Sequence, residues 1–232
     1  MKSSRSLRTN CVVLWRRCDS PLRVIRRTSA DRTDVLRMVD TIERQIDGIA
    51  RLAEDLTDAT RIGQGSLRMC KGDVDLIDCL SDTLDATVAA TAARHQTFTV
   101  EIPDQPLRIG CDPVRLSQAV SNFLHNAVKY TPPGGHIRFS AHTERMHLVL
   151  SVSDDGLGMS AALLPHVFDL FAQSSRTIAA SSGGLGIGLA VVSAIAHAHG
   201  GTVSASSAGP GAGSAFTLRL PVIAAQHAPD WT

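Results

Sequence analysis

The 232-residue sequence has few aromatic side chains, only 4%, so its core must be built from aliphatic residues. Its cysteines are odd in number and form no CxxC pair, which excludes a disulfide framework or a zinc site and indicates reduced thiols. No early apolar run approaches the roughly 20 residues that span a bilayer, the longest being 11–15. We therefore expect no membrane segment in this chain and a cytoplasmic location.

Charge is nearly balanced overall but unevenly distributed. The net charge is +1, yet residues 1–34 hold nine Lys/Arg against three Asp/Glu, which leaves 14 basic and 19 acidic residues for the remainder. This distribution argues against a general nucleic-acid surface. The Arg/Ser-rich segment 1–34 is typical of a poorly ordered basic tail and less so of a transit peptide. Residues 223–232 are expected to form a second tail.

A long helix is predicted over residues 35–63. Its apolar positions recur at three- and four-residue steps with charged residues between them, and Gly63 and Gly65 end the pattern. These positions are Val35, Met38, Val39, Ile42, Ile46, Ile49, Leu52, Ala53 and Leu56. Such a stripe needs a partner, either a second helix or another copy of the chain.

Residues 66–222 mix strands and helices without strict βαβ alternation. We predict strands at 66–70, 97–102, 136–144, 147–153, 202–206 and 214–220, and helices at 76–94, 113–130, 160–168 and 187–198. Asp112-Pro113 marks one helix start, because Asp is a good N-cap and Pro suits the first helical position. The pattern predicts an α/β fold, a two-layer α/β sandwich with a largely antiparallel mixed sheet and helices on one face.

A polar stripe follows the predicted helix 113–130. Asn122, Asn126 and Lys129 lie within about 60° of one another around the helix axis, opposite its apolar face. Mid-helix Asn is unfavourable, so the stripe suggests a site in which amide oxygens bind a hard cation and Lys reaches a phosphate. An ordinary solvated helix face fits the pattern about equally well.

Three glycine-containing segments accompany this stripe. Asp154–Gly158 follows a predicted strand and suits either a ligand contact or a simple acidic turn. Gly183–Gly188 leads directly into a helix, whose N-terminus favours an anion. A dinucleotide fingerprint is excluded there because a Ser/Gly/Ala-rich loop over 172–186, which we expect to be mobile, precedes it instead of a strand. Gly209–Gly213 is typical of a hairpin turn.

Taken in order, five segments resemble the motifs of sensor histidine kinases. The resemblance covers roughly 66–222, and five motifs in the right order make chance improbable. Asn122–Gly135 resembles the N-box of that family, and Asp154–Met159 resembles its first glycine box. Phe168–Gln173 resembles the F-box, Gly184–Ala190 the second glycine box and Gly213–Pro221 the closing strand. Residues 42–62 are similar to the second helix of that family's dimerisation hairpin.

The resemblance implies an ATP-binding catalytic domain of the histidine kinase/gyrase/Hsp90/mismatch-repair ATPase superfamily, with ATP and Mg²⁺ as ligands. Asp154 would accept the adenine amino group, Asn126 would hold Mg²⁺ with Asn122 supporting it, and Lys129 would face the phosphates. Tyr130 would border the base or ribose. The implied nucleotide-binding set is Asn122, Asn126, Lys129, Tyr130, Asp154, Gly156, Gly158, Gly184, Leu185, Gly186, Gly188, Leu189 and Thr217. Phe168 and Phe171 would anchor a lid, although plain core packing is the stronger interpretation for both.

One departure concerns the phosphoacceptor. The family carries a His on the first hairpin helix, whereas the best local match here places Arg16 at that position, and the first histidine of the chain is His95. His95 falls in the ATP-binding region and is interpreted as an ordinary surface residue. The expected partners are a response regulator or the histidine-bearing hairpin of another kinase, with a homodimer possible through 35–63.

Three functions are therefore weighed. The first is the kinase domain of a two-component sensor histidine kinase, which transfers the ATP γ-phosphoryl group to a histidine that is missing from residues 1–94 of this chain. The second is a degenerate nucleotide-binding partner of another kinase. The third is a superfamily ATPase, which the Asn at position 122 disfavours because those enzymes use a Glu there to activate water.

Overall fold

The computed structural model describes residues 69–103, 105–172 and 186–222, together with 32–39, 41–42 and the single positions 25, 46 and 57. The chain divides into two compact units, 1–65 and 66–232. In the first unit residues 33–39, 41–42, 46 and 57 are helical and lie within or beside the predicted helix 35–63, and residue 25, which precedes it, is also helical. The rest of that helix, the predicted tail 223–232 and most of the predicted tail 1–34 lie outside the described residues, although residues 33–34 of the latter are helical. Within the described part of the chain, the helices are too short or too polar to span a bilayer.

The second unit is built on a five-stranded mixed sheet with the order β2-β4-β5-β7-β6. Its strands are β2 (Thr97–Glu101), β4 (His136–Glu144), β5 (His147–Asp154), β7 (Ser214–Pro221) and β6 (Thr202–Ser206). Only β2 and β4 run parallel, and the other neighbours are antiparallel. A separate antiparallel pair joins β1 (Gly72–Asp75) to β3 (Arg108–Cys111).

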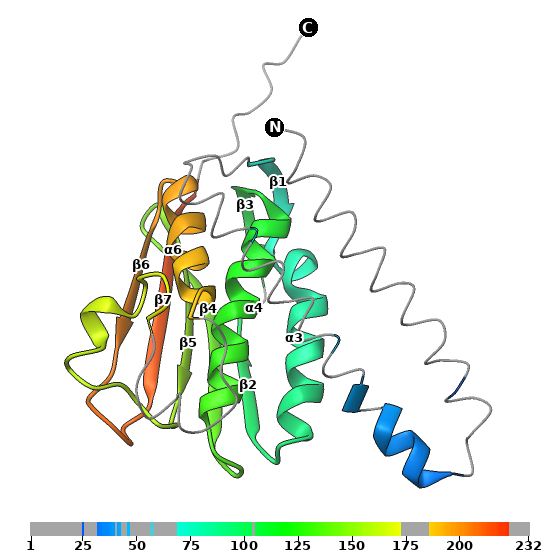
Figure 1. Cartoon of the computed structure of the whole chain (residues 1–232). Helices are drawn as coiled ribbons and strands as arrows, with labels where there is room; N and C mark the ends of the chain where they lie inside the picture. The colour runs from blue at the N-terminus through cyan, green and yellow to red at the C-terminus, as the bar shows by residue number, and fades with distance from the viewer. Residues whose placement is uncertain are drawn as a thin grey trace, which may run out of the picture. The chain divides into compact units, whose positions relative to one another are not determined.

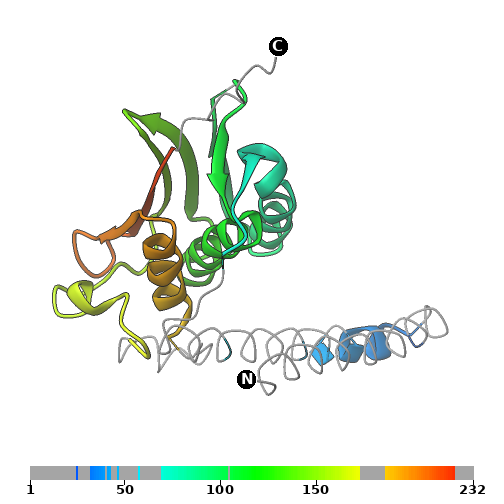
Figure 2. The same ribbon diagram turned by 90° about the horizontal axis from the view of Figure 1, so that it is seen from above.

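Within the described residues, three helices cover one face of this sheet. They are α3 (Leu76–Ala92), α4 (Pro113–Tyr130) and α6 (Gly188–Ala198), and they lie side by side with α4 in the middle (Figure 1). The view from above shows the helix layer and the curved sheet as two separate layers (Figure 2). The predicted two-layer α/β sandwich with a mixed sheet is therefore confirmed.

The core between the layers is mainly aliphatic, as the low aromatic content requires. Residues of α4 spaced three and four apart, including Leu116, Val120 and Leu124, are fully buried against alternate residues of the strands, such as Ile137 and Val152. A helix repeats every 3.6 residues and a strand every two, so residues at these spacings lie on the one face of each element that turns to the core. This burial fixes which face of α4 remains for a site.

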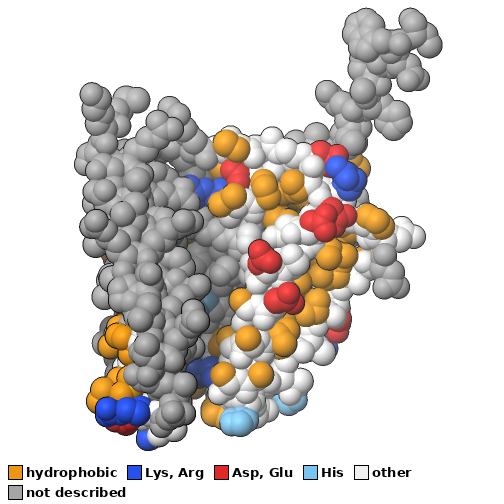
Figure 3. All heavy atoms as spheres, turned by 90° about the vertical axis from the view of Figure 1, so that its right-hand side faces the viewer, with side chains coloured by type: hydrophobic (Ala, Val, Ile, Leu, Met, Phe, Trp, Pro, Cys, Tyr) orange, Lys and Arg blue, Asp and Glu red, His pale blue; other side chains and the backbone are white. Residues whose placement is uncertain are grey.

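The outer side of α3 stays in water. Asp78, Asp82 and Asp85 are exposed along it, with the large apolar side chains Ile77 and Val88 also exposed on the same helix. Figure 3 shows acidic side chains scattered among hydrophobic ones on the described surface of the side that lies to the right in Figure 1. The helix is held by its opposite face, where Leu76 and Leu80 are buried.

Some predicted elements differ from the structure. The first strand lies at Gly72–Asp75, two residues or more beyond the predicted 66–70, and β3 was not predicted. The predicted helix 160–168 is only a 3₁₀ turn, Leu164–His166, among other turns. Short elements carry little periodicity, so four-residue strands are set by their pairing and cannot be read from the sequence alone. The predicted loop 172–186 lies almost entirely outside the described residues.

A buried histidine joins the far end of α6 to the start of α4. His199 donates from Nδ1 to the Ile195 carbonyl (2.9 Å) and accepts at Nε2 from the Asp112 backbone N–H (3.0 Å). Asp112 in turn accepts from the N–H groups of Arg115 (3.1 Å) and Cys70 (2.8 Å). Because Nε2 accepts, the ring is neutral, and burial lowers the His199 pKa below its ordinary value.

This bridge predicts a pH dependence of folding. Below about pH 6.5 the unfolded chain takes up a proton that folded His199 resists, so the free energy of unfolding should fall as the pH drops from 7 towards 5. We expect His199→Gln to lose about 1–2 kcal/mol at pH 7 and to flatten this slope, as measured by urea unfolding. An unchanged slope would exclude His199 as its source. The exposed His197, whose Nδ1 lies 2.7 Å from the Ser193 carbonyl oxygen on the same helix, gives the control variant His197→Gln, which should change stability much less than His199→Gln.

Candidate functional site

The polar stripe predicted on α4 lies on a well-defined helix. Asp112 is the N-cap, with its side chain accepting from the Arg115 N–H, and Pro113 occupies the first helical position, both as predicted. The helix ends at Thr131, whose extended backbone closes it with a bond to the Ala127 carbonyl. With the apolar face of α4 buried, the stripe is left half-buried at the side of the domain.

The members of the stripe differ in their contacts. Asn122 donates from Nδ2 to the Gly188 carbonyl of α6 (3.1 Å). The amide of Asn126, one turn later, makes no hydrogen bond with any residue in the described part of the chain. Lys129 places Nζ 4.8 Å from the centre of the Tyr130 ring, and no carboxylate among the described residues pairs with it. Asn126 and Lys129 thus offer an oxygen ligand and a cation to a ligand from outside.

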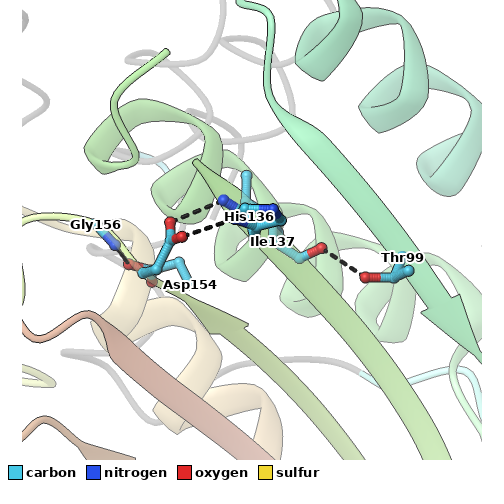
Figure 4. A network of polar contacts seen from close by, with 6 residues as sticks. Thr99, His136, Ile137, Asp154 and Gly156 are labelled. Carbon is cyan, nitrogen blue, oxygen red and sulfur yellow. Dashed lines mark hydrogen bonds and ion pairs between the residues drawn. The ribbon is translucent and has the colours of Figure 1, made fainter. Parts of the chain in front are cut away.

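Asp154 ends β5, and its carboxylate is half-buried. Its Oδ1 accepts from the backbone N–H of Gly156 (2.9 Å), which fixes the side chain over the turn (Figure 4). Burial raises the pKa of Asp154 to about 6, against lowering by the N–H groups of Gly156 and Ser214. A desolvated carboxylate near neutrality is common at functional sites, because structure alone gains nothing from such a group.

The turn after Asp154 is packed against α4 on one side. The Leu157 N–H donates to the Tyr130 carbonyl (3.1 Å), and a Cβ at Gly156 would overlap that same oxygen. The close approach requires glycine at 156. The backbone carbonyl of Tyr130 therefore helps to position the glycine box, independently of any role of its ring.

On the other side the turn is packed against the β6–β7 connection. The N–H groups of Gly211 and Gly213 donate to the carbonyls of Leu157 (2.7 Å) and Gly156 (3.2 Å). Ser207 accepts from the Met159 N–H (2.9 Å) and donates to the Gly213 carbonyl (2.7 Å). The segment 209–213, predicted as a hairpin turn, is such a turn, and it also clamps the glycine box.

Asp155, next to the site carboxylate, has a structural partner. It accepts from the backbone N–H (2.8 Å) and contacts the Nδ1 (2.9 Å) of His136, which opens β4 (Figure 4). These bonds from His136 hold the pKa of Asp155 below its usual value. The two adjacent carboxylates are therefore shifted in opposite directions, so that only Asp154 is left for a ligand.

The start of α6 carries glycines and lacks a side-chain cap. Ile187 occupies the N-cap position without any side-chain hydrogen bond to the first turn. The preceding Gly186 has a positive φ of 70°, and its carbonyl accepts from the Phe171 N–H (2.9 Å). Uncapped N–H groups at a helix start favour an anion. Leu189 in this turn is half-buried, whereas Gly184 and Leu185 lie outside the described residues.

The two F-box phenylalanines behave differently. Phe168 is half-buried and meets the Phe216 ring edge-on at 6.5 Å, so it packs against the core from its edge. For Phe171 core packing is wrong, since the side chain is 61% exposed and its backbone has a positive φ of 65°. The turn between Asp169 and Ala172 forces this conformation because it brings the Phe171 N–H to Gly186.

The remaining predicted residues are distributed as follows. Thr217 lies on β7 beside Ser151 of β5, with their hydroxyl groups 3.3 Å apart, and is half-buried. Gly158 has a positive φ of 61° and lies directly under the Gly209 carbonyl. His95 is exposed in the turn after α3, where its carbonyl accepts from the Gly134 N–H (2.7 Å). Sequence reasoning missed the roles of Ser207 and His136, for which only their places within two residues of a glycine gave a signal.

These features agree with a known family. Residues 111–224 match the family described as "Histidine kinase-, DNA gyrase B-, and HSP90-like ATPase". The chain carries the ATP-binding domain of a sensor histidine kinase. The match contains α4, Asp154, the start of α6 and β7, so every described residue of the predicted site lies within it.

Relatives of this kinase domain include the "Probable sensor histidine kinase TcrY" of Mycobacterium tuberculosis, 34% identical over 84% of this chain and 40% of the relative. Among solved structures, the "Mycobacterial sensor histidine kinase MprB" is 29% identical, covering 65% of this chain and 98% of that one, with a TM-score of 0.57. The full-length ShkA structure, solved with AMPPNP, covers 92% of this chain and 46% of that one (23% identity, TM-score 0.67) and shares the fold. The chain thus spans less than half of TcrY.

Proposed function

We propose that this domain binds Mg·ATP and transfers its γ-phosphoryl group to a histidine on a dimerisation hairpin, in the manner of two-component signalling. The observation that carries the proposal is that the site has two separate regions, one suited to an anion and the other to a hydrogen-bond donor. Asn126, Lys129 and the uncapped start of α6 offer an oxygen ligand, a cation and N–H donors, whereas Asp154 offers a half-buried acceptor at the end of β5. A triphosphate joined to an aminopurine matches both regions.

The residues would act by positioning and by charge. Phosphoryl transfer requires little covalent chemistry from the protein, since alignment and neutralisation of phosphate charge supply most of the rate. Lys129 would hold phosphate oxygens, and the first-turn N–H groups of α6 would receive the remaining anionic oxygens. Asp154 would accept from the adenine amino group, while Thr217, Tyr130 and Gly158 would border the base and ribose.

The donor set also fits Mg²⁺. The described residues contain no cluster of three or more His, Cys, Asp or Glu side chains that would enclose a metal. Mg²⁺ bound beside phosphates takes most of its ligands from water and phosphate oxygens and needs one or two from the protein. The amide oxygen of Asn126, which has no partner among the described residues, would be that ligand, and the ion would neutralise phosphate charge.

A superfamily ATPase is a poorer match. Such an enzyme needs a base at position 122 to activate water, but Asn122 is a poor base and uses its amide as a donor to Gly188. The nucleotide-binding partner without kinase activity is supported by one observation, the absence of histidine from residues 1–94. The same observation leads us to propose that the acceptor histidine comes from another hairpin, and that 35–63 contributes to dimer contacts.

Phosphotransfer to an added hairpin tests the proposal. The protein is incubated with radiolabelled ATP, alone and with a separate histidine-bearing hairpin from a related kinase. We expect acid-labile label on the added hairpin and none on this chain, because its first 94 residues lack a nucleophilic imidazole. Label on His95 or a later histidine would refute the assigned acceptor. Tight ATP binding without label on either component would favour the inactive nucleotide-binding partner.

A further inference from the structure

Asn122 and Gly188 form a contact between α4 and the first residue of α6. The Asn122 Nδ2 donates to the Gly188 carbonyl at 3.1 Å. A Cβ built on Gly188 would lie 3.3 Å from the Asn122 Oδ1 and 3.4 Å from its Cγ. The whole amide group of Asn122 therefore lies against the main chain of Gly188, and its orientation is set by the carbonyl that it faces.

The contact falls where α6 needs support. Its N-cap, Ile187, is 1% exposed and gives the helix no side-chain hydrogen bond. One residue earlier, the Gly186 carbonyl is held by the Phe171 N–H, and a Cβ on Gly186 would lie 2.7 Å from the Ala172 carbonyl oxygen. Residues 186–188 are thus held from two sides, by the 171–172 turn and by Asn122.

The two asparagines of the α4 stripe consequently differ. Asn126 has no hydrogen-bond partner among the described residues, whereas the amide of Asn122 is already used within the protein. With Nδ2 donating to the Gly188 carbonyl and Oδ1 also lying beside Gly188, the direction of the Asn122 amide is set by α6 and not by a ligand. Asn126 is therefore placed as a ligand and Asn122 as a residue that supports α6.

We infer that Asn122 is a positioning residue, not a ligand, and that it sets the distance between the Asn126 amide and the first-turn N–H groups of α6. The inference rests on the proposed nucleotide function only in assigning a purpose to that distance. The effect on α6 itself is a property of the free protein. It is therefore measurable even if the domain binds no nucleotide.

Asn122→Asp tests the hydrogen bond with little change in shape. An ionised Asp cannot donate and would place negative oxygens against the Gly188 carbonyl, so the first turn of α6 should loosen. Protonation at low pH would restore an O–H donor. Asn126→Asp is the matched control on the next turn of the same helix, where the side chain has no such bond to any described residue.

Hydrogen exchange of the nucleotide-free protein gives the measurement. Relative to wild type at the same pH, we expect peptides covering 186–194 to exchange about fivefold faster in Asn122→Asp at pH 7, with recovery towards wild type near pH 4–5. Asn126→Asp should show neither change. Unchanged exchange in peptides of β4 and β5 would show that the variant remains folded. If exchange increases in every peptide at pH 7, its recovery at low pH would still assign the effect to the ionised side chain at position 122.

A compensating pair provides the second readout. Gly188→Ala should speed exchange in the same peptides, because its Cβ would press on the Asn122 amide. In an Asn122→Ser background, which lacks that amide, the same substitution should have a smaller effect. Additive effects, or an Asn122→Asp variant that loses ATP binding with wild-type exchange in α6, would overturn the inference and make Asn122 a ligand. Loss of ATP binding in every protein, wild type included, would instead overturn the proposed function.

Discussion

Asp154→Asn is expected to make the nucleotide-free domain more stable and to weaken ATP binding. The Asp154 pKa is raised by burial from 3.8 to about 6, so the ionised form is disfavoured by the fold. A shift of about two pKa units corresponds to about 3 kcal/mol, which partial solvation reduces to about 1–2 kcal/mol at pH 7. The Asn side chain removes this charge and keeps an oxygen for the Gly156 N–H.

The sign of the pH effect follows from the same pKa. Between about pH 4 and pH 6 folded Asp154 holds a proton that the unfolded chain has lost, so this group lowers the stability of the fold as the pH rises through that range. The stabilisation by Asp154→Asn should therefore be largest above pH 6 and vanish near pH 4. His199 acts in the opposite direction, and the comparison of each variant with wild type separates the two contributions.

Urea unfolding and calorimetry with ATP measure the two halves of this prediction. ATP affinity should fall by about tenfold to a hundredfold, the worth of a hydrogen bond to a charged group. Asp155→Asn is the control, since the Asp155 pKa is lowered by His136 and its loss should not stabilise the fold. A destabilised Asp154→Asn would mean that this carboxylate is structural.

Gly213→Ala is expected to destabilise the domain by about 2–4 kcal/mol. Gly213 has a positive φ of 69°, and a Cβ there would overlap the Asp154 carbonyl oxygen. The conformational strain contributes about 1 kcal/mol, and the enforced backbone shift adds about 1–3 kcal/mol. Because the displaced backbone belongs to Asp154, ATP affinity should fall as well.

Gly211→Ala separates strain from crowding. Gly211 lies in the same turn with a positive φ of 83°, but nothing lies within 4 Å of a Cβ built there. Urea unfolding should show a loss of only about 1 kcal/mol, with ATP binding retained. Equal losses for the two variants would contradict the clamp on the glycine box.

The positions of the polar stripe and of Asp154 in the fold were predictable because the spacing that places them appears in consecutive residues. The stripe on α4 follows from helix geometry and Asp154 from the strand before it, whereas their roles in a nucleotide site come from the family resemblance and stay predictions. Contacts between distant segments were not predictable in this way. The bond from Asn122 to Gly188 spans 66 residues, and that from Asp112 to His199 spans 87 residues. No local pattern records which backbone groups the fold brings together.

The exposed Phe171 shows a different limit. Its aromatic side chain favours burial, and sequence reasoning followed that preference. The turn that joins its N–H to the Gly186 carbonyl determines the direction of the side chain instead. Backbone hydrogen bonding therefore outweighs the hydrophobicity of this residue in a way that composition does not reveal.

Calorimetric titration of the wild-type protein with Mg·ATP and Mg·GTP tests the central claim most directly. Guanine carries a carbonyl oxygen where adenine carries an amino group, so an ionised Asp154 would accept from adenine and repel guanine. We predict binding of ATP at pH 7.5 and at least about a hundredfold weaker binding of GTP, with the discrimination lost in Asp154→Asn. Equal affinity for the two nucleotides, or no binding of either, would contradict the assignment of this site.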